Sequence, residues 1–77
     1  MIVTRKLAAT ETLPARVRAS GYGIKAETTY PHGSDGSDAH KPAALAVARQ
    51  YYPGENVDVA YVSHTPTTYK FRIIRPE

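Results

Sequence analysis

Side chains that could hold a metal ion are concentrated in the loop before the most helix-like stretch of the chain. His32, Asp35, Asp38 and His40 fall within nine residues, and imidazole and carboxylate groups are common ligands of divalent metals. Their spacing matches none of the usual ligand patterns. Asp35-Gly36 is also an ordinary turn sequence, Asp38 a suitable helix cap, and His40 falls on an apolar stripe. We therefore expect no metal site and no cofactor.

Groups for nucleophilic catalysis are not arranged for that chemistry. The chain has no cysteine, and Ser63 and His64 are adjacent, which does not place a base against a nucleophile. No pair of carboxylates stands at a plausible site, and no glycine-rich loop could cradle a phosphate. We therefore expect that the protein is not an enzyme.

Composition narrows the class of protein. A chain of 77 residues predicts a single compact domain over residues 1–77, without room for a large internal cofactor. The net charge of +3 and a pI near 9.4 favour anionic partners mildly. The lack of cysteine excludes disulfides and favours the reducing cytoplasm. The sequence shows no apolar run suited to a signal peptide or a membrane span, so we expect no membrane contact.

The element that organises the chain is a helix expected over Ser37–Tyr52. His40, Ala44, Val47, Ala48 and Tyr51 fall on one stripe, with Leu45 and Tyr52 beside it. This stripe is rich in alanine, so the helix can lie close to a flat partner such as a sheet. Pro42 is tolerated best in a first turn, which places the start of the regular helix nearer residue 40, after a cap at Ser37 or Asp38. Pro53-Gly54 ends it.

Alternation of apolar and polar residues predicts strands on both sides of this helix. The expected strands are Ile2–Leu7, Ala15–Ser20, Ile24–Thr29, Val57–Ser63 and Thr68–Ile74. Gly21-Tyr22-Gly23 favours a hairpin between the second and third strands. The predicted fold is α+β, a single antiparallel sheet of four or five strands with one helix packed across one face. Inward positions would be Val17, Ile24, Val57, Val59, Phe71 and Ile73.

The opposite face of this sheet is expected to stay open and to carry much of the positive charge. In this register it holds Arg16, Arg18, Lys25, Lys70 and Arg72, with Glu27 and Asp58 among them. Charged side chains on strands also keep a soluble sheet from pairing with other sheets, which is the simpler interpretation. If the face binds a partner, Tyr22, Tyr30 and Tyr69 could add aromatic groups for single-stranded nucleic acid.

Tyr51 and Tyr52 allow two interpretations. Both rings can be structural and close the core at the end of the helix. Alternatively, Tyr52 joins Tyr61 or Tyr69 in an exposed aromatic patch that would suit a protein interface.

Three segments, residues 4–20, 26–50 and 57–73, resemble a set of small proteins from phages and prophages. The first segment matches their Thr-Arg-x-Leu-x-Ala-Thr-x-Thr pattern at Thr4, Arg5, Leu7, Ala9, Thr10 and Thr12. The second matches a tyrosine, a histidine and an alanine-rich helix at Tyr30, His40, Ala43 and Ala44. The GSDGSD loop is longer than in that set and the glycine-rich third strand is absent, so contacts made by loops do not carry over.

In size and topology the chain also resembles type I anti-CRISPR proteins, which are small phage-encoded blockers of host CRISPR effector complexes. This resemblance implies a stoichiometric inhibitor in the cytoplasm of a bacterial host. It would dock on an effector complex, a protein or ribonucleoprotein assembly, and block binding of target DNA or recruitment of a nuclease. Inhibitors that mimic DNA are typically acidic, so the basic composition argues against mimicry.

The alternative hypothesis is a small phage accessory protein that binds nucleic acid through the basic open face. Phosphate contacts would make its affinity fall steeply with salt, whereas an aromatic protein interface responds far less. The protein could be a monomer or a small homo-oligomer, because an exposed edge strand such as Ile2–Leu7 could pair with a second copy.

Overall fold

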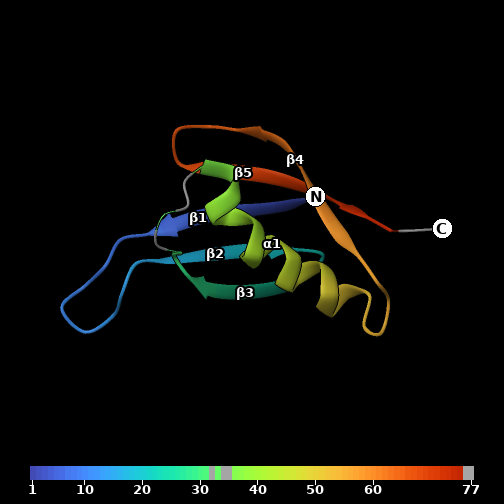
Figure 1. The fold of residues 1–77 in the computed structure, drawn as a ribbon, viewed down its shortest axis with the longest axis horizontal. Helices are drawn as coiled ribbons and strands as arrows, with labels where there is room; N and C mark the ends of the chain where they lie inside the picture. The colour runs from blue at the N-terminus through green and yellow to red at the C-terminus, as the bar shows by residue number, and fades with distance from the viewer. Residues whose placement is uncertain (32, 34–35, 76–77) are drawn as a thin grey trace.

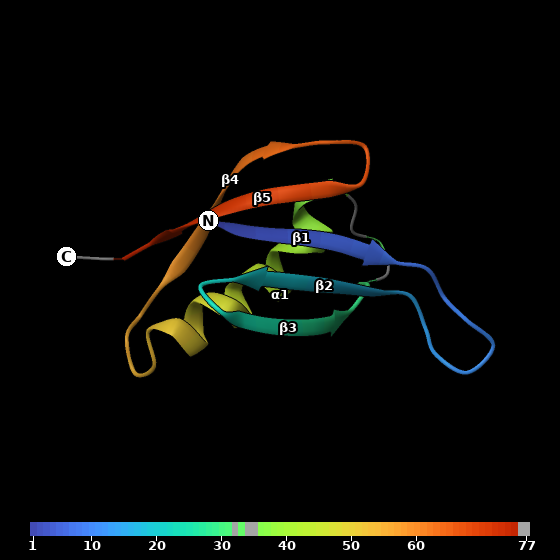
Figure 2. The same cartoon turned by 180° about the vertical axis from the view of Figure 1, so that it is seen from behind.

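The computed structural model describes residues 1–31, 33 and 36–75, which form one antiparallel sheet and one helix. The strands are β1 (Ile2–Leu7), β2 (Arg16–Gly21), β3 (Ile24–Thr29), β4 (Asp58–His64) and β5 (Thr68–Ile74). They are arranged in the order β3-β2-β1-β5-β4, and helix α1 (Gly36–Tyr51) lies across one face (Figure 1). Figure 2 shows the other face, which no described helix covers. The predicted α+β fold is confirmed.

A two-residue turn joins β2 and β3. Gly21 pairs with Ile24 across the hairpin, which leaves Tyr22 and Gly23 as the loop, with φ angles of 55° and 76°. Two consecutive positive φ angles define the type I′ turn, whose twist matches that of the strands it joins. The expected hairpin is therefore confirmed, although a bulky tyrosine occupies a position where asparagine is more usual.

The core lies between the helix and the sheet. Ile2, Val17 and Phe71 are fully buried on the sheet side, and Val57 and Val59 extend the core towards β4. The helix contributes buried alanines and one valine, namely Ala39, Ala43, Ala44, Val47 and Ala48. The alanine-rich stripe of the helix therefore faces the sheet, as predicted.

The ends of the helix differ from the prediction. The helix begins at Gly36, so Ser37 and Asp38 lie inside its first turn and the predicted capping role of Ser37 or Asp38 is wrong. Pro42 stands within the helix, where it cannot donate to the carbonyl of Asp38. Because Asp38 and Pro42 are both exposed, water can satisfy that carbonyl. Asp38 keeps its predicted place near the positive end of the helix dipole.

Strand β4 contains a bulge that the sequence did not predict. Tyr61 pairs with Phe71 and Ser63 with Lys70, so Val62 is an extra residue on β4. Side chains after the bulge therefore change faces. Ser63 moves to the open face, and His64, which lies one residue beyond the predicted strand, pairs with Tyr69 at the end of β4. The described part of the chain contains no helix that is both long and apolar enough to cross a bilayer.

Candidate binding surfaces

The predicted basic residues all lie on the face of the sheet that the helix leaves open. Residues directly opposite each other in an antiparallel pair share a face. Ile2 and Thr4 are buried beneath the helix, so Val3, Arg5 and Leu7 point the other way, and the register extends this face across the sheet. The resulting basic face contains Arg5, Arg16, Arg18, Lys25, Lys70 and Arg72.

Arg5 is the member of the basic face that sequence analysis missed. It lies on β1, the central strand of the sheet, directly opposite Arg18 on β2 and Thr68 on β5. The alternation of Ile2–Leu7 indicated which residues share a side with Arg5, but not which side meets the helix. Which side of β1 meets the helix depends on the strands beside it, and local sequence does not predict their positions.

The cations of the basic face differ in their acidic partners. Glu27 on β3 lies 3.7 Å from Arg16 and 3.7 Å from Arg18, so one carboxylate serves both. Asp58 lies 3.6 Å from Lys41 of the helix instead of pairing with a cation of this face. The remaining cations make no salt bridge with a residue that the structure describes: Arg5, Lys25, Lys70 and Arg72.

The aromatic groups expected to serve this face lie elsewhere. Tyr30 and Tyr69 pack against the core on the helix side of the sheet. Tyr22 stacks on Tyr51 at the end of the helix, with ring centroids 4.5 Å apart. The prediction that these tyrosines could line the basic face is therefore wrong, because all three rings pack on the helix side of the sheet.

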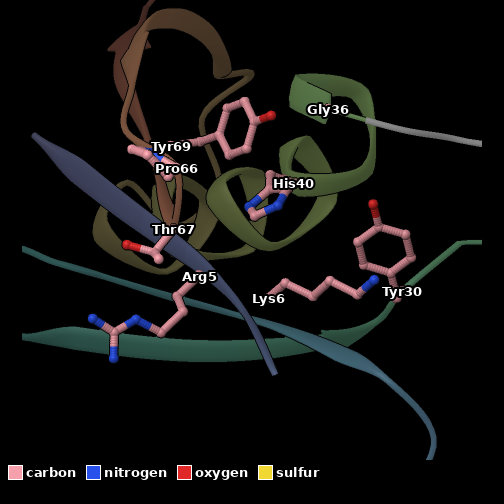
Figure 3. A pocket seen from close by; sticks show the side chains of 8 residues that line it. All are labelled: Arg5, Lys6, Tyr30, Gly36, His40, Pro66, Thr67 and Tyr69. Carbon is pink, nitrogen blue, oxygen red and sulfur yellow. The ribbon is translucent and has the colours of Figure 1, made fainter. Parts of the chain in front are cut away.

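Instead, rings and polar groups surround a pocket on the helix side. This cavity of about 640 Å³, the ring pocket, is lined by Arg5, Lys6, Tyr30, His40, Thr67 and Tyr69 (Figure 3). Its walls come from the end of β1, the residue after β3, the helix and the β4–β5 turn. These segments meet because β1 pairs with both β2 and β5 in the centre of the sheet.

His40 forms the buried wall of the ring pocket, with only 4% of its surface exposed. Its Nδ1 lies 2.7 Å from the hydroxyl oxygen of Thr4, which also donates to the carbonyl of Tyr69 at 3.4 Å. Burial lowers the pKa of His40 below its ordinary value, and the nearby Lys6 ammonium lowers this pKa further. The ring is therefore neutral near pH 7.

The rings continue from His40 to the edge of the sheet. Tyr69 lies 4.3 Å from the His40 ring and 5.1 Å from the His64 ring, measured between centroids. Tyr61 on β4 is hydrogen-bonded through its hydroxyl group to Nδ1 of His64. The bulge at Val62 makes this row possible, because without it His64 would face the opposite side of the sheet.

A metal site in the loop before the helix has no support among the described residues. Within them, no three histidine, cysteine, aspartate or glutamate side chains gather as a ligand set. His40 is bonded to Thr4, and Asp38 is exposed in the first helical turn. The other two proposed ligands, His32 and Asp35, lie outside the described residues.

No model of a known protein family, no curated protein and no solved structure matches this chain. Its function is therefore argued from its two surfaces, the basic face and the ring pocket.

The tyrosine pair at the end of the helix divides between core and surface. Tyr52 is half-buried against the core, and the guanidinium of Arg75 lies over its ring, 4.3 Å from the centroid. Tyr51 is 43% exposed and stacks on Tyr22, so its predicted place in the core is wrong. Among the described residues, the ring that contacts Tyr52 is that of Tyr51, so the predicted alternative of a patch with Tyr61 or Tyr69 is wrong.

Proposed function

We propose that this protein is a binding protein that docks its basic face on an anionic macromolecular surface. The partner proposed is a host CRISPR effector complex, and the protein would act as a stoichiometric inhibitor. The basic face supports the anionic character of the partner. The choice of partner rests on the resemblance of the sequence to small phage proteins and anti-CRISPR proteins.

The observation that carries this proposal is the direct opposition of Arg5 and Arg18. Like charges at directly paired positions of an antiparallel sheet destabilise it. The carboxylate of Glu27 partly neutralises the charge of Arg18, but Arg5 has no salt bridge with any described residue. A phosphate or carboxylate of a partner would relieve the same repulsion and add favourable contacts.

The separation of aromatic and basic groups supports a docked complex over a stacking platform. Proteins that hold single strands without sequence preference combine a basic groove with rings on which the bases stack. On the basic face, the described side chains are charged, aliphatic or small and polar, and the tyrosines lie on the helix side. An anionic protein surface, or the backbone of RNA held in an effector complex, fits such a face better.

A second candidate function is a phage accessory protein that contacts only the phosphates of a nucleic acid. It is favoured by the cations that make no salt bridge with a described residue, namely Arg5, Lys25, Lys70 and Arg72. Its signature would be an affinity that falls by nearly one log unit per log unit of salt for each phosphate neutralised.

A pull-down with a pair of charge-matched variants tests both functions. The tagged protein is recovered from a lysate that contains a type I CRISPR complex, with and without nuclease, beside an Arg5→Gln/Arg72→Gln variant. The control, Lys41→Gln/Arg49→Gln, removes the same charge from exposed helix positions. Each preparation is also added to the purified complex, and binding of target DNA is measured.

The two functions predict different results. The inhibitor is supported if effector subunits are still recovered after nuclease treatment. Their recovery should also be lost with the first variant and retained with the control. Nucleic acid alone, released by nuclease or by salt, would support the accessory protein. Equal loss in both variants, or full recovery in both, would show that the basic face is not the docking surface.

A further inference from the structure

We propose that the ring pocket binds a nucleotide, with its phosphate at Lys6 and its base between the rings of Tyr30 and Tyr69 against His40. This site lies on the opposite side of the sheet from most of the basic face and does not depend on the inhibitor function. The inference follows from three features of the pocket.

The first feature is a cation on the side of β1 that faces the helix. Residues Ile2 and Thr4 on this side are fully buried, and Lys6 continues the same alternation at the mouth of the pocket. Its ammonium lies 4.3 Å from the centroid of the Tyr30 ring and makes no salt bridge with a described residue. Arg5 also borders the pocket, but its side chain points to the open face, so the ammonium of Lys6 is the positive charge that favours an anion at the mouth.

The second feature is a hydrogen-bond acceptor on the pocket wall. Thr4 has one hydroxyl hydrogen, so its bonds to Tyr69 and His40 form together only if Thr4 donates to the carbonyl and accepts from Nδ1–H. The neutral ring then has its lone pair on Nε2. No described residue donates to Nε2, although His40 is buried and lines the pocket. An acceptor on a pocket wall favours a ligand with an N–H or O–H donor.

The third feature is the pair of tyrosine rings that flank His40 (Figure 3). The Tyr69 ring lies 4.3 Å from that of His40, and the Tyr30 ring meets His40 edge-on at 6.3 Å. Flat rings bind planar heterocycles by stacking, and the volume of about 640 Å³ falls in the usual range for small-molecule sites. A planar base with N–H donors that is joined to a phosphate satisfies all three features.

Such a nucleotide could be free or could be one unit of a strand. Titrations followed by NMR distinguish these sources, with AMP, UMP, a tetranucleotide of uridine, inorganic phosphate and adenosine as probes. We expect AMP or UMP to shift the signals of Lys6, His40 and Tyr69, and to bind at least tenfold more tightly than phosphate or adenosine alone. Much tighter binding of the tetranucleotide would identify a strand, and equal binding a free nucleotide.

Variants separate this site from the basic face. Lys6→Gln should weaken AMP binding at least tenfold, because a charge-assisted contact is lost. The matched change Lys25→Gln on the open face should change the affinity for AMP by less than twofold. Tyr69→Leu, checked for folding by thermal melting, should weaken AMP but not phosphate. Lys70→Gln/Arg72→Gln should leave AMP binding intact even if it abolishes docking of the macromolecular partner.

Three results would overturn the inference. They are AMP binding no more tightly than phosphate, adenosine binding as well as AMP, and equal losses in Lys6→Gln and Lys25→Gln. Each of these can occur whether or not the basic face docks on a partner, so failure of one proposal is distinct from failure of the other.

Discussion

A hydrogen bond of 2.7 Å between the Thr4 hydroxyl and Nδ1 of His40 ties helix α1 to β1, the central strand of the sheet. Both side chains are buried, and the other buried residues that the structure describes are apolar. The bond fixes the orientation of the imidazole that forms the wall of the ring pocket. It is therefore a link between the stability of the fold and the chemistry of that pocket.

Replacing Thr4 by valine tests this link, because valine keeps the shape and removes the hydroxyl group. We expect the free energy of unfolding to fall by about 1–3 kcal/mol, since Nδ1 of His40 is left buried without a partner. Urea denaturation measures the loss. Thr4→Ser keeps the hydroxyl and should preserve the ¹⁵N signals of the neutral His40 ring, which Thr4→Val should change. Unchanged stability in Thr4→Val would contradict the role of this bond.

The pKa of His40 predicts a loss of stability in acid. Burial and Lys6 lower this pKa below the ordinary value of about 6.5, so below that pH the unfolded chain binds a proton that the folded chain does not. Stability should be constant with respect to this group above pH 6.5. It should then fall, with a slope of at most about 1.4 kcal/mol per pH unit, until the folded pKa is reached.

Lys6→Gln provides the control for this pH dependence. Removing the ammonium should raise the pKa of His40 and shorten the pH range over which stability falls. The imidazole signals of His40 in NMR spectra, followed against pH, report this pKa directly. A His40 pKa that does not respond to Lys6→Gln would show that the two groups do not interact.

Local sequence patterns predicted most of the elements, because alternation and turn residues are strong along this chain. The bounds of β1, β3 and β5 agree with prediction, and the hairpin turn at Tyr22–Gly23 lies where its glycines placed it. The bulge at Val62 was missed, because the residues around it keep an apparently regular alternation. Only the pairing with β5 shows that one residue is extra.

The two surfaces were predictable to different degrees. The basic face follows from strand periodicity, which gave all its members except Arg5. The ring pocket joins Lys6, His40 and Tyr69, which are far apart in the sequence and meet only because β5 lies beside β1. Strand order of this kind is not encoded in local patterns. The contact between Tyr51 and Tyr22 could not be predicted for the same reason, because Tyr22 lies in a turn that is distant in the sequence.

Tyr22 and Tyr51 provide a test of how a strained turn is stabilised. A φ of 55° costs a non-glycine residue about 1–2 kcal/mol, and an aromatic stack returns about 0.5–1.5 kcal/mol. Asparagine adopts this conformation more readily. We expect Tyr22→Asn to stabilise a Tyr51→Ala background by about 1 kcal/mol and to be nearly neutral in the native background. Equal effects in both backgrounds, measured by urea denaturation, would show that the stack contributes nothing.

Glu27 provides a test of the basic face that leaves the fold almost unchanged. Its contacts are 3.7 Å long, to the exposed Arg18 and the half-buried Arg16, and weak at that length, so Glu27→Gln should cost less than about 1 kcal/mol of stability. The same change frees two cations, and affinity for an anionic partner should rise, most clearly at low salt. Glu55→Gln, which removes an equal charge near Arg75, is the control. Weaker binding by Glu27→Gln would place the partner elsewhere.

Gly21 is the position at which the smallest added group should be most disruptive. A Cβ atom there would lie 2.9 Å from the backbone oxygen of Met1 and 3.2 Å from Cα of Ile2. Backbone atoms of a central strand cannot rotate away, so β1 and β2 must separate at this end of the sheet. We expect Gly21→Ala to destabilise the protein by about 1–3 kcal/mol, whereas Ser20→Ala on the exposed face should change stability by less than about 0.5 kcal/mol. Thermal denaturation of the two variants measures this difference, and equal melting temperatures would mean that the strands are not packed this closely.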